Sequence, residues 1–320
     1  MPSEGRRYDP AALPVGMPRR LLLAALAAAV FASLIGAPSA FADALTPESG
    51  GSQNADDIDT LYKLTFYIGI VVFLLVWGTL IWSLVRHRVR RGGTADQIRG
   101  NTPLEIGWTL GAASILVVLT VVTFIYLDDI ESPPPSGPNG LSASSSQFAT
   151  IDQPDPPGDG GPVLRIRVNG QQYIWRYVYP GEGQLFSYQE MVVPTDTTVV
   201  LELEASDVIH SWWIPKLGPK MDAVPGHVNE TWFKIPADQA GTEFRGQCAE
   251  LCGRNHANMY AEVVALPFDE WEQWYDDEAQ EIADAEEYAT EEREQLEQSE
   301  GEDAIQGTSG ASNTNTNPAE

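Results

Sequence analysis

Both cysteines of this chain lie in one stretch of twelve residues, 248–259, whose sequence is Cys-Ala-Glu-Leu-Cys-Gly-Arg-Asn-His-Ala-Asn-Met. Three residues separate Cys248 from Cys252, and His256 and Met259 follow closely. Thiolates, imidazoles and thioethers are the soft ligands that proteins offer to copper. A blue-copper site uses a single cysteine for one metal ion. The second thiolate therefore predicts a site in which two cysteines bridge two copper ions.

The spacing alone leaves two other interpretations of the cysteines open. Outside the cytosol, a closely spaced pair can form a disulfide. Two cysteines and two histidines can also hold a structural zinc ion. His256 and Met259 favour a metal site over a disulfide, and Met259 is superfluous for zinc.

A copper site needs a further imidazole from another segment, and the chain has four histidines. His210 follows an apolar Val-Ile pair and precedes Ser-Trp-Trp-Ile, which places it at the expected end of a strand. His227 lies in a Val-Pro-Gly-His turn and is expected to be exposed. A single histidine beside an apolar segment is most often structural, but the incomplete copper site favours His210 as a ligand.

Two long apolar segments, residues 64–85 and 106–127, are each long enough to cross a bilayer as a helix. The loop between them carries five arginines: Arg86, Arg88, Arg90, Arg91 and Arg99. Arginine-rich loops stay in the cytoplasm, so the pattern predicts a transmembrane hairpin over residues 61–128 with both outer ends outside. His87 is then cytoplasmic and cannot reach the copper site. The chain is expected to be a multi-pass cell-membrane protein whose copper domain is extracytoplasmic.

Residues 1–42 have the pattern of a secretory signal peptide: two arginines precede an apolar run, and Ala-Phe-Ala ends the segment. The apolar run is short for a membrane span. The alternative is an anchor helix that is not cleaved, and Met17 is a second candidate for the translation start. Residues 43–60 form a polar, acidic N-terminal segment.

The chain beyond the hairpin is predicted to be a linker followed by a β-domain. Residues 129–162 are rich in Pro, Gly and Ser, which is typical of a linker. Residues 163–266 alternate apolar and polar positions between Pro and Gly turns, which predicts an antiparallel sandwich or barrel. The expected strands fall in 164–168, 173–179, 199–204, 228–235 and 260–266.

The C-terminal part of the chain is strongly acidic. Residues 267–297 are predicted to form an acidic helix, with Trp271, Trp274 and Tyr275 as a docking edge. Residues 298–320 are rich in Ser, Asn, Thr and Gly and are predicted to be disordered.

The formal net charge of the chain is −26, from 45 acidic and 19 basic residues, and only four of the basic residues are lysines. Nucleic-acid-binding proteins are basic, so this composition disfavours that class. An acidic, lysine-poor surface is typical of proteins from halophiles, because high salt screens dense like charge. The alternative is a single acidic tail, but acidic residues also dominate earlier segments.

Residues 207–226 read Asp-Val-Ile-His-Ser-Trp-Trp-Ile-Pro-Lys-Leu-Gly-Pro-Lys-Met-Asp-Ala-Val-Pro-Gly. Together with residues 248–259, this segment resembles subunit II of the haem–copper cytochrome c oxidases. The resemblance covers about residues 56–275, and the paired motifs are specific. It implies a two-helix transmembrane hairpin followed by an all-β, cupredoxin-like Greek-key sandwich that carries a binuclear copper centre called CuA.

The resemblance also implies a role for each ligand. The implied copper ligands are Cys248 and Cys252 as bridges, His210 and His256 with one ion each, and Met259 and the Glu250 carbonyl as weak axial ligands. The Glu250 side chain would reach a magnesium ion at the contact with subunit I.

Two further positions resemble functional positions of the family. After a Gln, the family has a Trp near the copper that receives the electron; here Tyr173 stands at that place, with Trp175 two residues on. Both are candidates for accepting the electron, and the alternative is simple packing in an aromatic strand. Glu105, in Leu-Glu-Ile-Gly-Trp-Thr, matches a family Glu near the cytoplasmic mouth of a proton channel in subunit I. A carboxylate there can equally cap the helix.

The function implied by the resemblance is that of subunit II in a proton-pumping terminal oxidase. A soluble external donor, either a cytochrome c or a small blue-copper protein, would reduce the copper centre. The electron would then pass, through His256, to haem in subunit I, where oxygen is reduced to water, and subunit III is a further expected partner. The sequence contains no evident nucleophile or general base, so the chain is not expected to be catalytic alone.

The main competing hypothesis is a membrane-anchored copper-delivery or assembly protein. Such proteins also carry C-x3-C, but their ligand histidine follows the pair, whereas His210 precedes it here. Nitrous-oxide reductase has a similar copper domain, but this chain has no room for its propeller. Quinol-oxidase relatives lack the copper ligands, so quinol is not the expected donor.

Overall fold

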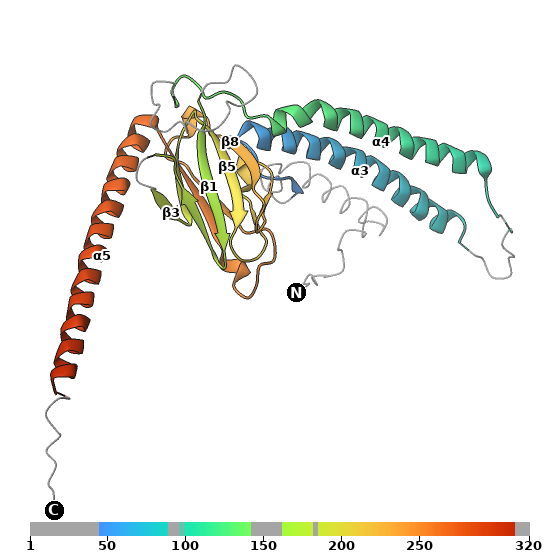
Figure 1. Cartoon of the computed structure of the whole chain (residues 1–320). Helices are drawn as coiled ribbons and strands as arrows, with labels where there is room; N and C mark the ends of the chain where they lie inside the picture. Colours follow the sequence, from blue (N-terminus) through green and yellow to red (C-terminus); the bar gives the residue numbers. More distant parts are fainter. Residues whose placement is uncertain (1–44, 89–96, 98, 142–161, 182–184, 311–320) are drawn as a thin grey trace, which may run out of the picture. The chain divides into compact units, whose positions relative to one another are not determined.

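The computed structural model describes residues 45–88, 97, 99–141, 162–181 and 185–310, and for 299–310 it describes the backbone alone. The chain divides into two units, residues 1–47 and 48–320. The predicted signal peptide and Met17 lie outside the described residues. Figure 1 shows the elements of the second unit, which are a pair of long helices, a group of β-strands and a third long helix.

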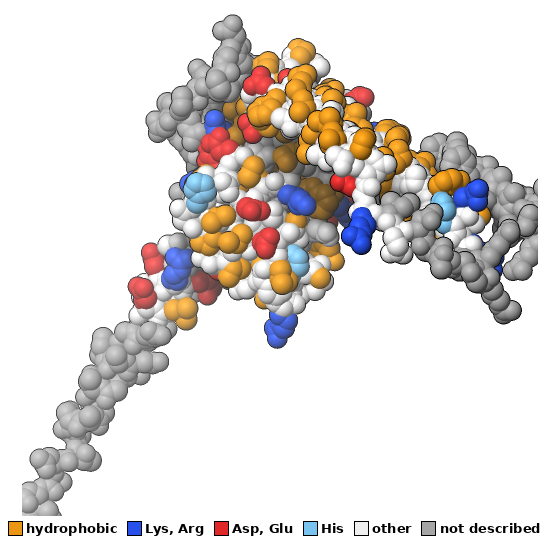
Figure 2. All heavy atoms as spheres, turned by 90° about the vertical axis from the view of Figure 1, so that its right-hand side faces the viewer, with side chains coloured by type: hydrophobic (Ala, Val, Ile, Leu, Met, Phe, Trp, Pro, Cys, Tyr) orange, Lys and Arg blue, Asp and Glu red, His pale blue; other side chains and the backbone are white. Residues whose placement is uncertain are grey.

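Helices α3 (Gln53–Arg86) and α4 (Thr102–Glu131) contain the two predicted membrane spans and lie side by side (Figure 1). Both are long and apolar enough to cross a membrane, and their most apolar stretches are not buried within the chain. Figure 2 shows hydrophobic side chains gathered on the surface of this helical pair. Such a surface is expected where helices face lipid or a membrane partner.

Helix α3 begins well before the predicted span, so part of the polar segment 43–60 is helical. Asp56 lies in its first turn, where the helix dipole favours a negative charge. Helix α4 begins with a reciprocal cap. The Asn101 side chain accepts a hydrogen bond from Leu104 N at 3.3 Å, and Glu105 Oε1 accepts one from Asn101 N at 3.0 Å. The capping role considered for Glu105 is therefore observed.

Ten strands are present among the described residues. Their bounds are β1 Leu164–Gln171, β2 Ile174–Val178, β3 Phe186–Tyr188, β4 Glu190–Pro194, β5 Thr198–Ala205, β6 His210–Trp212, β7 Met221–Ala223, β8 Asn229–Lys234, β9 Glu243–Gln247 and β10 Tyr260–Leu266. One sheet has the order β3-β2-β1-β5-β8, a second has the order β4-β10-β9, and β6 pairs with β7. Side chains of both sheets meet in one buried core, so the predicted two-sheet β-domain is confirmed.

The pairing within the sheets is mixed, so the prediction of a wholly antiparallel sandwich is wrong. Strand β1 runs parallel to β5, and β4 runs parallel to β10. The remaining pairs are antiparallel. The chain leaves the larger sheet after β3, forms β4 in the smaller sheet, and returns as β5 beside β1. Hydropathy alternation indicates which face of a sheet a residue occupies but not the direction of the neighbouring strand. The sequence therefore could not distinguish parallel from antiparallel pairing.

Strand β8 is hydrogen-bonded to the segments at the outer ends of both long helices. Asn54 Nδ2 donates to the Trp232 carbonyl at 2.6 Å, and Ser52 Oγ accepts from Lys234 N at 3.1 Å. The Trp232 indole donates to the Ile130 carbonyl at 2.9 Å. These bonds satisfy buried polar groups at the junction between the hairpin and the β-domain.

Helix α5 (Phe268–Gly310) docks on the sandwich through its first turns. The Trp271 indole donates to the Val192 carbonyl at 3.0 Å, and the Tyr275 hydroxyl donates to the Pro180 carbonyl at 2.7 Å. The predicted docking edge is therefore observed. The helix continues past residue 297 into the segment predicted to be disordered, as far as Gly310. Residues 311–320 lie outside the described residues.

Candidate metal centre

The ligand candidates come together where β6, β9 and β10 meet. His210 is the first residue of β6, Cys248 directly follows β9, and Met259 directly precedes β10. Strands β9 and β10 form an antiparallel pair, and beyond its end Cys248 N donates to the Met259 carbonyl at 2.9 Å. This pairing closes residues 248–259 into a loop, with His256 opening the short 3-10 helix η3 (His256–Asn258) inside it.

The ligand atoms form a compact group around the two sulfur atoms. Cys248 Sγ and Cys252 Sγ are 3.9 Å apart. His210 Nδ1 lies 3.9 Å from Cys248 Sγ, and His256 Nδ1 lies 3.5 Å from Cys252 Sγ. Met259 Sδ is 3.8 Å from Cys252 Sγ. The two thiols are thus neighbours of one another, and each has an imidazole nitrogen of its own.

His210 reaches this loop because β6 is tied to it through the backbone. Ala249 N donates to the Ser211 carbonyl at 2.8 Å, and Gln247 N donates to the Trp213 carbonyl at 3.0 Å. Among the described residues, His210, Cys248 and Cys252 form the only group of three or more His, Cys, Asp or Glu side chains whose ligand atoms lie within 4.8 Å of one another. All three are buried, so water is largely excluded from the sulfur atoms.

Sequence reasoning missed Asp207, although it stands three residues before His210. Its Oδ1 lies 2.9 Å from His210 Nε2 and accepts a hydrogen bond from Val208 N at 2.7 Å. A carboxylate at Nε2 places the imidazole proton there and leaves Nδ1 free to bind a metal. The signal that could have revealed this residue is the D-x-x-H spacing.

Electrostatics favour one thiolate in the metal-free chain. Burial opposes ionisation of Cys248, but hydrogen bonds to His210 and to the backbone of Ser211 lower the pKa of its thiol to about 6. Burial, together with the negative charge of Cys248, raises the pKa of Cys252 to about 11. Burial disfavours the charged form of His210, yet its contacts with Cys248 and Asp207 raise its pKa. A metal that binds both sulfurs must therefore displace a proton from Cys252 at neutral pH.

The donor set separates the interpretations that the spacing left open. Both cysteines are free, and 3.9 Å is far beyond the roughly 2.05 Å of a disulfide bond. A structural zinc site needs four ligands and would leave the buried Met259 sulfur superfluous. Two thiols, two imidazoles and a thioether fit the soft ligand preference of copper. The group is therefore consistent with a copper site.

The remaining candidates have clear places in the structure. The Glu250 carbonyl oxygen is 3.2 Å from Cys248 Sγ, while the Glu250 side chain is exposed. His227 is exposed, as expected from its turn. His87 is exposed just after α3, far along the chain from the β-domain, and does not join the group.

Tyr173 and Trp175 both lie beside the ligands. Trp175 is fully buried, and its ring centroid is 5.8 Å from that of His210. Tyr173 is partly buried at the turn between β1 and β2, and a Cβ added at Gly253 would lie 2.6 Å from its hydroxyl. The buried Trp175 therefore contacts a ligand, and Tyr173 covers the ligand loop nearer the surface.

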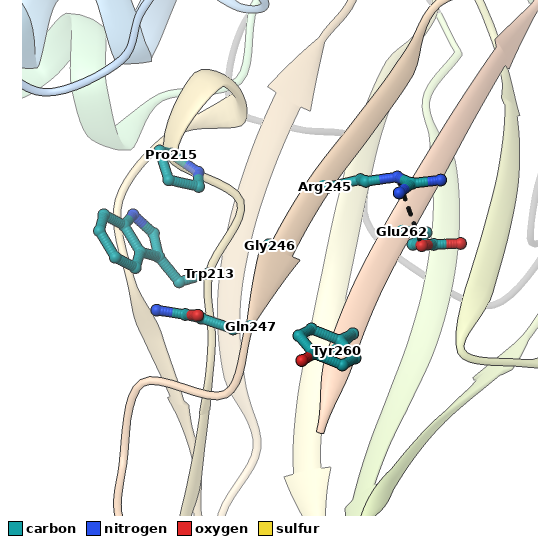
Figure 3. Close-up of a pocket in the computed structure, with 7 residues that line it drawn as sticks. All are labelled: Trp213, Pro215, Arg245, Gly246, Gln247, Tyr260 and Glu262. Carbon is teal, nitrogen blue, oxygen red and sulfur yellow. Dashed lines mark ion pairs between the residues drawn. The ribbon is translucent and has the colours of Figure 1, made fainter. Parts of the chain in front are cut away.

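Residues of β9, β10 and the segment that follows β6 line a pocket (Figure 3). The residues that line it are Trp213, Pro215, Arg245, Gly246, Gln247, Tyr260 and Glu262. Its charged members pair with each other, with Arg245 Nε 3.5 Å from Glu262 Oε1. Gln247 and Tyr260 each neighbour a ligand in sequence.

Comparison with known proteins agrees with this geometry. Residues 183–266 match the family pattern described as cytochrome c oxidase subunit II, periplasmic domain, and residues 41–125 match its transmembrane domain. Cytochrome c oxidase subunit 2 of Thermostichus vulcanus is 32% identical over 259 residues, which cover 72% of this chain and 77% of the relative. This chain belongs to the cytochrome c oxidase subunit II family.

Other members show similar identity. The subunit 2 of Alkalihalophilus pseudofirmus is 34% identical over 66% of this chain, and that of Bacillus subtilis is 30% identical over 80%. The chain spans about half (55%) of the length of the first and 67% of the second. The crystal structure of the periplasmic domain of the Bradyrhizobium japonicum subunit II shares 33% identity with a TM-score of 0.35, covering 37% of this chain and 95% of that one.

Family membership settles several predictions. The chain is a membrane protein with two transmembrane helices and a periplasmic domain, so the topology inferred from the arginine loop is confirmed. It belongs with the subunits II of cytochrome c oxidases rather than with copper-delivery proteins. A halophilic origin is not addressed by these comparisons and stays a prediction from composition.

Proposed function

We propose that this chain is the electron-accepting subunit of its oxidase, with a binuclear CuA centre held by the Cys248–Met259 loop and His210. It receives electrons from a soluble periplasmic donor, a cytochrome c or a small blue-copper protein, for the reduction of oxygen to water coupled to proton pumping. The observation that carries the proposal is the pair of thiols 3.9 Å apart, each with an imidazole Nδ1 of its own at 3.9 or 3.5 Å. A blue-copper site, which binds one metal ion, uses a single cysteine.

Each ligand has a definite task in this proposal. Cys248 and Cys252 would hold both copper ions through their thiolates, with His210 and His256 each holding one of them, and Met259 and the Glu250 carbonyl would be weaker ligands. Bound there, the pair of copper ions would supply a one-electron redox centre. Burial of both sulfurs and the hydrogen bond from His210 to Asp207 hold the protein ligands in place in either redox state.

The surroundings suggest where the chain meets its partners. Tyr173 and Trp175 are the proposed route inward from the donor, because one lies over the ligand loop and the other packs on His210. His256, only partly buried, is the proposed exit toward haem in subunit I. The exposed Glu250 carboxylate is free to reach a magnesium ion at that contact. Subunit III is a further proposed partner.

Glu105 is proposed to serve a second role near a proton channel of subunit I, beside its observed role as a helix cap. A carboxylate can do both because Oε1 accepts the Asn101 N–H, while no hydrogen bond to Oε2 is recorded among the described residues.

The test is metal analysis and electron paramagnetic resonance of the full chain, loaded with copper in detergent. The expected result is two coppers per chain and a mixed-valence signal shared equally between them. Cys252→Ser should abolish that signal, whereas Ala249→Ser, which adds a hydroxyl to the same loop without removing a thiol, should keep it. One copper per chain, selective retention of zinc, or an unchanged signal in Cys252→Ser would each overturn the binuclear assignment.

A further inference from the structure

Gln172, in the turn between β1 and β2, contacts both of the separate segments that supply the metal ligands. Its side-chain Nε2 donates a hydrogen bond to the Cys252 carbonyl at 2.6 Å. Its backbone N donates to Asp207 Oδ2 at 2.7 Å. Cys252 is itself a ligand candidate, and Asp207 is the partner of another. One residue of a β-turn therefore bonds to the Cys loop and to the His segment at once.

These bonds form a continuous chain across the centre. Asp207 uses Oδ2 for Gln172 and Oδ1 for His210 Nε2, at 2.9 Å. The connection thus runs from the Cys252 carbonyl through Gln172 and Asp207 to the His210 ring. Cys252 is 4% exposed and His210 is fully buried, whereas Gln172 itself lies at the surface. The link therefore reaches from an exposed turn to two buried ligands.

The turn is also pressed closely against the ligand loop at Gly253. A Cβ at this position would lie 2.9 Å from Gln172 Nε2 and 2.6 Å from the Tyr173 hydroxyl. Gly253 has φ +132°, a conformation that residues with a Cβ rarely adopt. Loop residues 253–255 are exposed, and the turn lies against the loop at Gly253.

We propose that Gln172 is a positioning residue for the metal centre, which sets the place of Cys252 relative to His210. This inference rests on the proposed copper function of the same ligands. Metal–ligand distances tolerate only about 0.2 Å of error. Mutation of a residue that orients a ligand typically lowers metal affinity 10- to 100-fold. Loss of the amide donor frees the Cys252 carbonyl while Asp207 keeps its backbone bond to Gln172. The expected result is a change on the Cys252 side of the centre, with His210 still held.

The experiment compares Gln172→Met with Gln171→Met in the full chain in detergent. Methionine nearly matches the length of glutamine but has no N–H to donate. Gln171 is the matched control, because its amide donates to Asn169 at 3.0 Å, outside the metal centre. Chelator competition, the copper hyperfine pattern, the midpoint potential and the Tm of the copper-free chain are measured for each.

In Gln172→Met, we expect about a 10-fold loss of copper affinity or more and unequal hyperfine coupling to the two coppers. The copper-free Tm should match that of Gln171→Met. Gln172→Glu, which sets an acceptor against the same carbonyl, should produce a larger spectral change. An unchanged spectrum and affinity in both Gln172 variants, or a fall in copper-free Tm without a spectral change, would overturn the positioning role. A wild-type chain that binds one copper would instead refute the binuclear function.

Discussion

Gly170 is the position at which one added methyl group should disturb the metal centre most directly. It lies in β1 opposite Trp175, and a Cβ there would be 3.0 Å from Trp175 Cζ3 and 3.0 Å from His210 Cδ2. Ordinary van der Waals contact begins at 3.4 Å, so each neighbouring atom must move away by about 0.4 Å. Both neighbours are fully buried, and His210 is held from behind by Asp207.

The required shift can be compared with what the site tolerates. A displacement of about 0.4 Å at His210 is roughly twice the 0.2 Å that metal sites accept. Overpacking of a buried position costs about 1–3 kcal/mol. We therefore expect Gly170→Ala to lower the free energy of unfolding of the copper-free chain by about 1–3 kcal/mol. We also expect copper affinity to fall about 10-fold or more, which is 1.4 kcal/mol or more.

The assay is urea unfolding of the copper-free full chain, together with copper titration followed by its absorption and paramagnetic resonance spectra. Gly69→Ala is the control, because its added methyl meets nothing within 4 Å. Adding Trp175→Phe to Gly170→Ala removes one of the two clashes and should restore part of the lost stability, since contacting residues couple by about 0.5–3 kcal/mol. A Gly170→Ala chain with wild-type stability, affinity and spectrum would refute the packing argument.

Two further predictions concern the sandwich and its helix. Tyr179 accepts a hydrogen bond from Val192 N at 2.8 Å, and burial raises the pKa of this phenol. Its folded pKa lies above the unfolded value of about 10, so the stability it contributes is complete below pH 10 and is lost as the pH rises further. Tyr179→Phe leaves the Val192 N–H without its partner and should lower the free energy of unfolding at pH 7 by about 1–3 kcal/mol. In urea unfolding, the variant should lose less stability than the wild-type chain between pH 7 and about pH 11. Equal losses in the two chains would contradict this reasoning. Trp271 is fully buried, so Trp271→Ala should lower the free energy of unfolding by about 3–5 kcal/mol and make α5 sensitive to limited proteolysis. Tyr288 lies on the exposed part of α5, so Tyr288→Ala should change that free energy by no more than about 0.5 kcal/mol. Comparable losses in both variants would count against docking through Trp271.

Local patterns in the sequence predicted the helical hairpin and the longer strands. The hairpin followed from two apolar runs and five arginines, which are properties of contiguous residues. Strands β1, β2, β5, β8 and β10 followed from alternation over five to eight residues. Strands β3, β6 and β7 have only three residues each, too few for a period of two to be recognised. Strand β4 is nearly all buried, and β9 has a single buried residue, so neither alternates clearly.

The sequence by itself determined that two cysteines, a histidine and a methionine lie close together, because all four fall within twelve residues and a loop of that length keeps them near one another. It also pointed to His210 by elimination among four histidines. Only the tertiary structure decided that His210 Nδ1 lies 3.9 Å from Cys248 Sγ, and that Asp207 and Gln172 brace the ligands. Apart from the local Asp207–His210 contact, these contacts join residues 35 to 80 positions apart. They exist because the parallel pairing of β1 with β5 and the docking of β6 on the loop after β9 bring distant segments to one end of the sandwich.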